Sequence, residues 1–468
     1  MKRSIKSLIL LMVLAVFAGG YFLIDALTNR QANVQESAGS YPLLGEGANI
    51  AALSWERDGA TIALRKNGDA WQVEGDAEYP LDQEAVKALV SSLAALAGNL
   101  RLEGVDAPED YGLDAPALVA EIELADGQTR TLSLGNETLL GGEYYVSAGE
   151  AGVVYVTDVA LSSVLSASLD ELTQWEEIPQ VDDIARLVIL GPSASLDQKY
   201  YEDSAALTYN PEWHWFQTGL QYPSDTDAMR LLLDDVAALA WNGFVAHGVA
   251  GEALAEYGLD SAGSTSVVVF VEGQSESALS LVIGASCEEG YYAMLAGSDC
   301  VYTMAAESVA SLLQATDASV RATDVLRLDW QQVVRVEFDA GTSLVLERIE
   351  AEAEEGDAAN VETAEGEEEE ASAETVTLNG ETVDAAYARE AFEDITFLEG
   401  DGFVDGVEVT EPLLTINVYT NLEDFPEITL RFGAHDATSY VLENGVQPPM
   451  LVSASSVDTL IRTWSYMP

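Results

Sequence analysis

The chain has 468 residues, 48% of them hydrophobic, and carries 80 acidic residues against 20 basic ones, for a formal net charge of −60. This hydrophobic content excludes an intrinsically disordered protein, and the length suggests about three folded units of 100–200 residues. Because negative charge of this size repels phosphate groups, we expect no nucleic-acid partner.

The amino terminus has the charge and hydropathy pattern of a membrane segment. Three basic residues among the first six precede an uncharged run over residues 7–24. Such a run is near the minimum length for a bilayer-spanning helix, and leading basic residues favour a cytoplasmic amino terminus with the rest of the chain outside. We therefore predict that residues 1–27 are a retained single-pass signal-anchor in the cell membrane. A cleaved signal peptide is the alternative.

Residues 28–47 are small and polar, which predicts a tether. Beyond it, one pattern of elements occurs three times. The segments TRTLSLG, ALSLVIG and EITLRFG have apolar residues one and three positions before a final glycine, which is Gly135, Gly284 or Gly433. Alternation with a period of two is typical of a half-buried strand, and we expect each glycine to end its strand.

An amphipathic helix is predicted upstream of each of these strands. Asp82, Asp225 and Asp384 each precede apolar residues at offsets of 4, 7, 8, 11 and 14. This spacing is typical of a helix capped by the aspartate, so we interpret the three carboxylates as N-caps and not as catalytic groups. A second apolar stripe with i, i+3, i+4 spacing closes each copy and predicts a second helix.

The tetrapeptide YGLD occurs twice, at residues 111–114 and 257–260. In each copy the glycine, Gly112 or Gly258, is expected to adopt a left-handed conformation that stops a helical turn. Leu113 and Leu259 would then fold back as the apolar residue after the stop, and Tyr111 and Tyr257 would pack on the core. The third copy retains only a degenerate stop around Gly406. Each copy opens with a hairpin, which ends near Trp71 in the first.

These elements predict an α+β protein with three tandem homologous domains, each an antiparallel sheet with two packed helices, after the transmembrane helix. The domains are residues 48–180, 181–322 and 323–468. Within the third, residues 350–374 are almost entirely acidic and small, which predicts a disordered extension of a hairpin.

Candidate chemistry is sparse. Cys287 and Cys300 flank one short segment, and their spacing fits a disulfide or two thiols equally well. His214, His247 and His435 fall at different points of the repeat. No catalytic, cofactor-binding or metal-binding motif is present, so we predict no catalytic residue, no cofactor and no metal site.

The order of these motifs resembles that of a bacterial family known as domain of unknown function 4340. The residues that carry the resemblance in the first copy are Trp71, Tyr79, Pro80, the YGLD of residues 111–114, Leu134, Gly135 and the YYV of residues 144–146. The resemblance implies a membrane-anchored extracytoplasmic protein, often encoded beside export-type ABC transporters and gliding-motility-like components, without established catalytic residues.

Two functional hypotheses follow. The first is a non-enzymatic scaffold or accessory protein that binds a partner in the membrane or envelope through protein–protein interaction. The resemblance implies an association with an ABC-type export or gliding-motility-like system. The alternative is an envelope protein that binds a ligand or ion, or a hydrolase, with a site between repeats.

Overall fold

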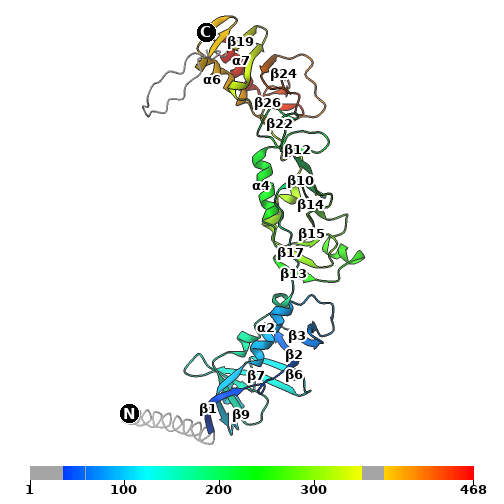
Figure 1. Ribbon diagram of the computed structural model, residues 1–468, viewed down its shortest axis with the longest axis vertical. Helices are drawn as coiled ribbons and strands as arrows, with labels where there is room; N and C mark the ends of the chain where they lie inside the picture. Colours follow the sequence, from blue (N-terminus) through cyan, green and yellow to red (C-terminus); the bar gives the residue numbers. More distant parts are fainter. Residues whose placement is uncertain (1–34, 58, 350–373, 468) are drawn as a thin grey trace, which may run out of the picture. The chain divides into compact units, whose positions relative to one another are not determined.

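The computed structural model describes residues 35–57, 59–349 and 374–467 (Figure 1). The chain divides into two compact units, one that ends at Glu177 and one that begins at Ile178. The first unit contains one antiparallel sheet and the second contains two. The predicted anchor, residues 1–27, lies outside the described residues. Within the described ranges, no helix is long and apolar enough to cross a membrane.

The first sheet has nine strands in the order β1-β5-β9-β8-β7-β6-β2-β3-β4. They are β1 (Gln35–Pro42), β2 (Ile50–Arg57), β3 (Ala60–Asn67), β4 (Ala70–Val73), β5 (Ala97–Glu103), β6 (Leu118–Leu124), β7 (Thr129–Glu137), β8 (Tyr144–Ser147) and β9 (Val153–Thr157). Helices α2 (Gln83–Ala94) and α3 (Leu161–Val164) accompany it, with 3-10 turns η1 (Pro108–Tyr111) and η2 (Asp170–Leu172).

The second sheet has eight strands in the order β12-β11-β10-β14-β15-β16-β17-β13. They are β10 (Ile184–Leu190), β11 (Ser195–Tyr200), β12 (Trp215–Gln217), β13 (Gly243–Ala246), β14 (Thr265–Val271), β15 (Leu279–Cys287), β16 (Gly290–Leu295) and β17 (Val301–Met304). Its helical segments are α4 (Thr226–Ala237), η3 (Gly251–Tyr257), α5 (Ala306–Val309) and η4 (Leu312–Gln314).

The third sheet has nine strands in the order β21-β20-β19-β18-β23-β24-β25-β26-β22. They are β18 (Val333–Asp339), β19 (Ser343–Ile349), β20 (Thr375–Leu378), β21 (Glu381–Val383), β22 (Gly400–Phe403), β23 (Leu414–Thr420), β24 (Glu427–Ala434), β25 (Ser439–Glu443) and β26 (Met450–Ser453). Its helical segments are η5 (Trp330–Gln332), α6 (Ala385–Thr396) and α7 (Ala454–Ser465).

One strand order recurs in all three sheets. Once the terminal strands β1 and β21 are set aside, each sheet reads as a three-stranded opening meander, then four consecutive antiparallel strands, then the strand that follows the long helix. The prediction of an α+β fold with three antiparallel sheet domains is confirmed.

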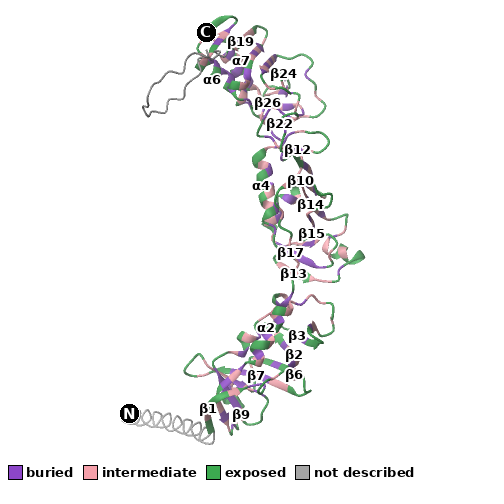
Figure 2. Cartoon of the chain, viewed as in Figure 1, coloured by how far each residue is buried: buried purple, intermediate pink, exposed green. Residues whose placement is uncertain are grey.

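The long helices begin as their sequences dictate. Asp82 accepts hydrogen bonds from the backbone N–H groups of residues 84 and 85, and Asp225 and Asp384 each accept one from the first turn of their helix. These bonds satisfy backbone donors that have no partner within the helix. The residues at offsets of 4, 7 and 11 from each aspartate are buried against the sheet, while the opposite side of a helix such as α4 is exposed (Figure 2).

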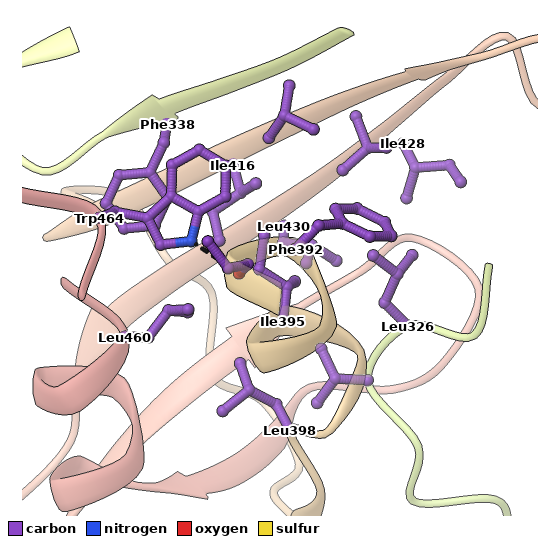
Figure 3. Close-up of a cluster of buried hydrophobic side chains, with 14 of the residues drawn as sticks. Leu326, Phe338, Phe392, Ile395, Leu398, Ile416, Ile428, Leu430, Leu460 and Trp464 are labelled. Carbon is purple, nitrogen blue, oxygen red and sulfur yellow. Dashed lines mark hydrogen bonds between the residues drawn. The ribbon is translucent and has the colours of Figure 1, made fainter. Parts of the chain in front are cut away.

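The second helix forms fully only in the third domain. In the first two domains α3 and α5 have four residues each, whereas α7 has twelve. A second helix is thus present in each domain, as expected, but in the first two domains it is only about one turn long. The apolar stripe of α7 continues to Trp464, which stacks on Phe338 with ring centroids 4.8 Å apart and donates its indole N–H to the Ala391 carbonyl at 3.0 Å (Figure 3). The sequence after α3 turns polar at Ser166, so no such anchor extends that helix.

The predicted tether was also wrong over its described part. Gln35–Pro42 form β1, which pairs antiparallel with β5, and Leu43 and Leu44 are buried in the core of the first domain. A terminal strand is held by backbone hydrogen bonds, so its side chains need not be apolar. Two consecutive leucines were the signal in the sequence that this segment folds onto the domain.

A loop joins the second and third sheets within the second unit. The connection between β11 and β12 carries Tyr209, which is buried in the core of the third domain and donates its hydroxyl to the Val325 carbonyl at 2.9 Å. The Asn444 amide donates to the same tyrosine oxygen at 3.2 Å. The corresponding hairpin of the first domain has a two-residue turn between Asn67 and Ala70 in place of this loop.

At the corresponding hairpin of the third domain lies the acidic segment. Residues 350–373 are outside the described residues, but Glu374, the last residue of the predicted disordered extension, is described and well packed. Its carboxylate forms an ion pair with Arg348 at 2.8 Å and accepts a hydrogen bond from the Trp330 indole at 3.0 Å. Glu374 thus closes the hairpin rather than belonging to a disordered segment.

Candidate functional site

The two YGLD segments form the same turn. In the first domain η1 ends at Gly112, whose φ is 71°, and in the second η3 ends at Gly258, whose φ is 64°. The following N–H groups reach back into the turn, from Leu113 to the Pro108 carbonyl at 3.0 Å and from Leu259 to the Leu254 carbonyl at 2.9 Å. Left-handed glycines with this backward bond terminate helical turns, so the motif is a helix stop.

The strand glycines lie directly beneath these turns. A Cβ atom placed on Gly135 would be 2.2 Å from the Tyr111 carbonyl oxygen, and one on Gly284 would be 2.3 Å from the Tyr257 carbonyl oxygen. Any side chain here would collide with backbone, so only glycine lets the turn lie on the sheet. The YGLD and strand-glycine motifs are therefore two halves of one contact.

This contact corrects the role predicted for the strand glycines. β7 continues through Glu137 and β15 through Cys287, so neither strand ends at its glycine. Each strand instead shifts register against its neighbour in the short interval that contains the glycine. The physical reason for glycine is close approach of a second segment, and not release of the chain into a loop.

In the part of the third domain that the structure describes, the strand glycine is retained but the turn is not. A Cβ on Gly433 would lie 3.0 Å from the nearest side-chain carbon of Val409. Val409 is held by hydrogen bonds from its N–H to Glu443 and from Arg431 to its carbonyl. A side chain thus replaces the tyrosine carbonyl, and β24 pairs with β25 without a register shift.

Each YGLD tyrosine packs edge-on against a second tyrosine. The ring centroids of Tyr111 and Tyr145 are 4.9 Å apart with an interplanar angle of 82°, and those of Tyr257 and Tyr292 are 5.1 Å apart with an angle of 84°. Such T-shaped pairs contribute about 0.5–1.5 kcal/mol beyond the burial of their area.

We predicted that Tyr111 and Tyr257 pack on the main core, and this prediction was wrong. They belong to small apolar clusters on the other face of each sheet, as the alternation along β9 shows: Val154 and Val156 contact the Tyr111 cluster, whereas Tyr155 belongs to the main core. A corresponding cluster surrounds Tyr257 in the second domain. The YGLD turns therefore cover the sheet face that the long helices leave open.

Burial and neighbouring charges raise the pKa of both tyrosines of the first pair. Burial raises the pKa of Tyr111, and the neighbouring Tyr145, Asp110 and Glu36 raise it further. Burial and the charges of Glu36 and Glu143 raise the pKa of Tyr145. A tyrosine that resists ionisation is a poor general base, so this pair is suited to packing and not to proton abstraction.

An open cavity of about 610 Å³ adjoins the second turn. Its lining is neutral and combines apolar side chains with serine hydroxyls: Leu190, Gly191, Pro192, Leu259, Ser261, Ala262, Ser264, Ser266 and Val282. Since this lining contains no titratable side chain, the cavity lacks a group for acid–base chemistry.

The remaining reactive side chains are scattered. His214 directly precedes β12 and His247 directly follows β13, which are opposite edges of the second sheet, while His435 follows β24 in the third. Cys287 and Cys300 are not joined in a disulfide. Over the described ranges, no three His, Cys, Asp or Glu side chains are grouped so that they could hold a metal ion.

Trp71 shows how the opening hairpin is attached. Its indole is buried, and its backbone N–H and carbonyl bond to the side-chain amide of Gln83, the first residue of α2, at 2.8 and 2.9 Å. The residue therefore positions the meander against the long helix.

A family model described as a domain of unknown function, DUF4340, matches residues 71–178 and 213–412, which is more than half of the chain. The chain belongs to the DUF4340 family. The first DUF4340 match begins at Trp71 and includes the turn at Gly112 with its partner Gly135, and the second includes Gly258 with Gly284. The resemblance drawn from these motifs is confirmed. No curated protein matches the chain.

Sequence reasoning missed three features of this region. It did not pair the turns with the strand glycines, it did not assign Tyr209 to the third domain, and it did not separate Glu374 from the acidic run. A signal was present for the first, because each glycine replaces a side chain within an alternating strand pattern.

Proposed function

We propose that this protein is a non-enzymatic, membrane-anchored extracytoplasmic scaffold or accessory protein. The observation that carries the proposal is the contact between the YGLD carbonyls and the strand glycines. It accounts for the most distinctive repeated residues by packing alone, at 2.2 and 2.3 Å from a hypothetical Cβ. In an enzyme we would expect repeated residues of this kind to form an active site. Here the repeated tyrosines and glycines attach a turn to a sheet.

The anchor enters this proposal from the basic and apolar pattern of residues 1–27. The partner is an envelope or membrane protein, and the family resemblance favours a component of an ABC-type export or gliding-motility-like system. The shared strand order supports the further proposal that the three sheet domains are homologous copies produced by duplication.

Fractionation of cells that express the full chain tests the anchor. We expect the intact chain to stay with the membrane pellet after alkaline washing, because an apolar helix is not displaced by removal of surface charge contacts. A soluble product that begins near Gly19 would show a cleaved signal peptide and overturn the anchor.

Crosslinking in native membranes followed by mass spectrometry tests the accessory role. We expect recovery of an integral membrane protein, and specifically a transporter subunit. Repeated failure to recover any integral membrane protein would contradict the accessory role while leaving the anchor intact.

A ligand-binding function is the second candidate, and the cavity beside Leu259 favours it. Its volume of about 610 Å³ lies in the range of small-molecule sites, and its serine hydroxyls would suit an uncharged polar ligand. Isothermal titration with uncharged sugars would test it, with the Ser264→Trp variant, which fills the cavity, as the control.

A further inference from the structure

The connection between β7 and β8 presents two leucines to solvent. Leu139 and Leu140 have 104% and 95% of their reference surface exposed, the largest values among the exposed large hydrophobic side chains of the described residues. An unburied pair of this kind is unfavourable in water, and such features mark contacts with membranes or proteins.

The turn that carries the leucines is well defined. The Thr138 N–H donates to the Glu143 carbonyl at 2.8 Å, and the Gly141 N–H donates to the Thr138 carbonyl at 3.0 Å. The Gly142 N–H donates to the Glu137 carboxylate at 2.6 Å. Gly141 and Gly142 have φ values of 78° and 79°, which only glycine adopts readily. The leucines are thus held at the tip by a hydrogen-bonded frame.

The two other sheet domains place polar residues at this connection. Glu288 and Glu289 lie between β15 and β16, and Asp436 lies between β24 and β25. The first domain, which is the one next to the amino-terminal segment, has a Leu-Leu pair at this connection in addition to the acidic Glu143. The difference indicates a role that belongs to this domain.

The strand register locates the tip on the sheet. Pairing of β1 with β5, β5 with β9, β9 with β8 and β8 with β7 brings Pro42, Ala97, Val159 and Leu139 to one end of the sheet, while Gln35 lies at the other. The exposed side chain of Val159 therefore lies at the same end as the tip.

The length of the chain that precedes the sheet limits how the first domain can be oriented when its tip meets the bilayer. From Gln35 to the tip is about 30 Å, at about 3.3 Å for each strand residue with the turn added. Residues 28–34 separate the predicted anchor from Gln35, and seven residues have a maximum reach of about 24 Å. The height of an upright first domain exceeds that reach, so the tip meets the bilayer in a domain that is tilted.

From these observations we infer that Leu139 and Leu140 insert into the membrane surface as a second, shallow contact of the first domain with the bilayer. This inference rests on the proposed membrane anchor. Two leucines bury less apolar surface than a myristoyl chain, which alone binds with an association constant of only about 10⁴ M⁻¹. The tip therefore requires the local concentration that the anchor supplies.

The acidic side chains beside the leucine tip favour lipids with headgroups of no net charge. Glu137 and Glu143 border the tip, and Asp158 lies next to Val159 at the same end of the sheet. These carboxylates repel anionic headgroups within a Debye length of about 8 Å, so the tip favours a surface of zwitterionic lipids.

Depth-dependent quenching tests the insertion. The full chain carries a fluorophore on Leu139→Cys in a Cys287→Ala background, where the buried Cys300 is protected from labelling. It is reconstituted into phosphatidylcholine vesicles that contain a doxyl-labelled lipid. The matched control is Leu220→Cys, at an exposed leucine of the second domain. We expect quenching several-fold stronger at position 139, weaker quenching when Leu140→Ser is added, and weaker quenching in vesicles rich in phosphatidylglycerol.

Each other outcome overturns the inference. If the protein co-floats with the vesicles and quenching is equal at positions 139 and 220, the contact between tip and membrane is contradicted but the membrane anchor is not. Protection of position 139 in native membranes without quenching in pure lipid assigns the tip to a protein. Failure of the chain to co-float removes the anchor and the tip with it, because the tip cannot bind without local concentration.

Discussion

The first two sheet domains and the third share a glycine at one strand position but place different atoms against it. In the first two, a backbone carbonyl would lie 2.2–2.3 Å from an added Cβ, and in the third a valine methyl would lie 3.0 Å away. A carbonyl is fixed by its turn, whereas a valine side chain can change rotamer. The same residue is therefore indispensable in two domains and only favourable in the third.

The first two domains and the third also differ in which face of the sheet carries additional stabilising contacts. The first two cover the open face of the sheet with a turn and a pair of tyrosines and close with a four-residue helix. Over its described residues the third has no such turn, but it extends α7 to Trp464, which is fully buried. The third domain lacks the contact between a turn and the open face of the sheet, but it buries more apolar surface between its helices and the opposite face. The same strand order can therefore be stabilised by contacts on either face of the sheet.

The largest predicted effect comes from adding one methyl group. We expect Gly135→Ala and Gly284→Ala each to reduce the free energy of unfolding of their own domain by roughly 3 kcal/mol or more, because the Cβ forces the turn off the sheet. Gly433→Ala should cost about 1 kcal/mol or less, since Val409 can move. Hydrogen exchange measured by mass spectrometry along β7, β15 and β24 reports each domain separately.

Equal exchange in the three variants would contradict this comparison. It would mean that the YGLD turn shifts as easily as a side chain. Serine substitutions at the same glycines are a second check, because a polar side chain of similar size should cost as much as alanine if the effect is steric.

The local parts of this architecture could be predicted from the sequence. An N-cap depends on residues within one turn, so Asp82, Asp225 and Asp384 were recognisable from their spacing to the apolar stripes that follow. The left-handed stops at Gly112 and Gly258 depend on equally local bonds.

Features that depend on distant partners could not be predicted. The strand pattern marks Gly135 as unusual, but the residue that requires a glycine there is Tyr111, which lies 24 positions earlier and is not identified by that pattern. β1 forms because β5 offers backbone groups to a polar segment. Glu374 is hidden in an acidic run, and its partners lie 26 and 44 positions away at Arg348 and Trp330.

An intermediate effect is predicted at the hairpin that Glu374 closes. Burial alone would raise the pKa of Glu374, but hydrogen bonds from Arg348 and Trp330 outweigh it and hold the pKa below its ordinary value. Because the folded-state pKa is depressed, the carboxylate stabilises the third domain above its unfolded pKa, and this stabilisation is lost as the pH falls through the folded pKa. Glu374→Gln should cost about 2 kcal/mol at neutral pH, since Arg348 keeps its charge without a counterion.

Chemical unfolding at neutral pH and at pH 3 separates this effect from other carboxylates. The difference between wild type and Glu374→Gln should shrink at the lower pH, because the stabilisation is lost as the pH falls through the depressed folded-state pKa of Glu374. Glu381→Gln, at an exposed acid of β21, is the matched control and should show little change. An unchanged difference across the pH range would refute the role of the charge.

The smallest predicted effect separates packing from chemistry at the tyrosine pairs. Within the described residues the Tyr111 hydroxyl makes no hydrogen bond to protein, so Tyr111→Phe should change the free energy of unfolding by about 0.5 kcal/mol or less at neutral pH. Because burial raises the folded-state pKa of Tyr111, the wild type should lose stability as the pH rises above 10, and the phenylalanine variant should lose less. Tyr257→Phe should also change the free energy of unfolding little at neutral pH, because within the described residues the Tyr257 hydroxyl makes no hydrogen bond to protein. A large loss of stability or of membrane-protein crosslinking in either variant at neutral pH would show that the tyrosine hydroxyls bind a partner. The YGLD turns would then have a binding role in addition to packing on the sheet.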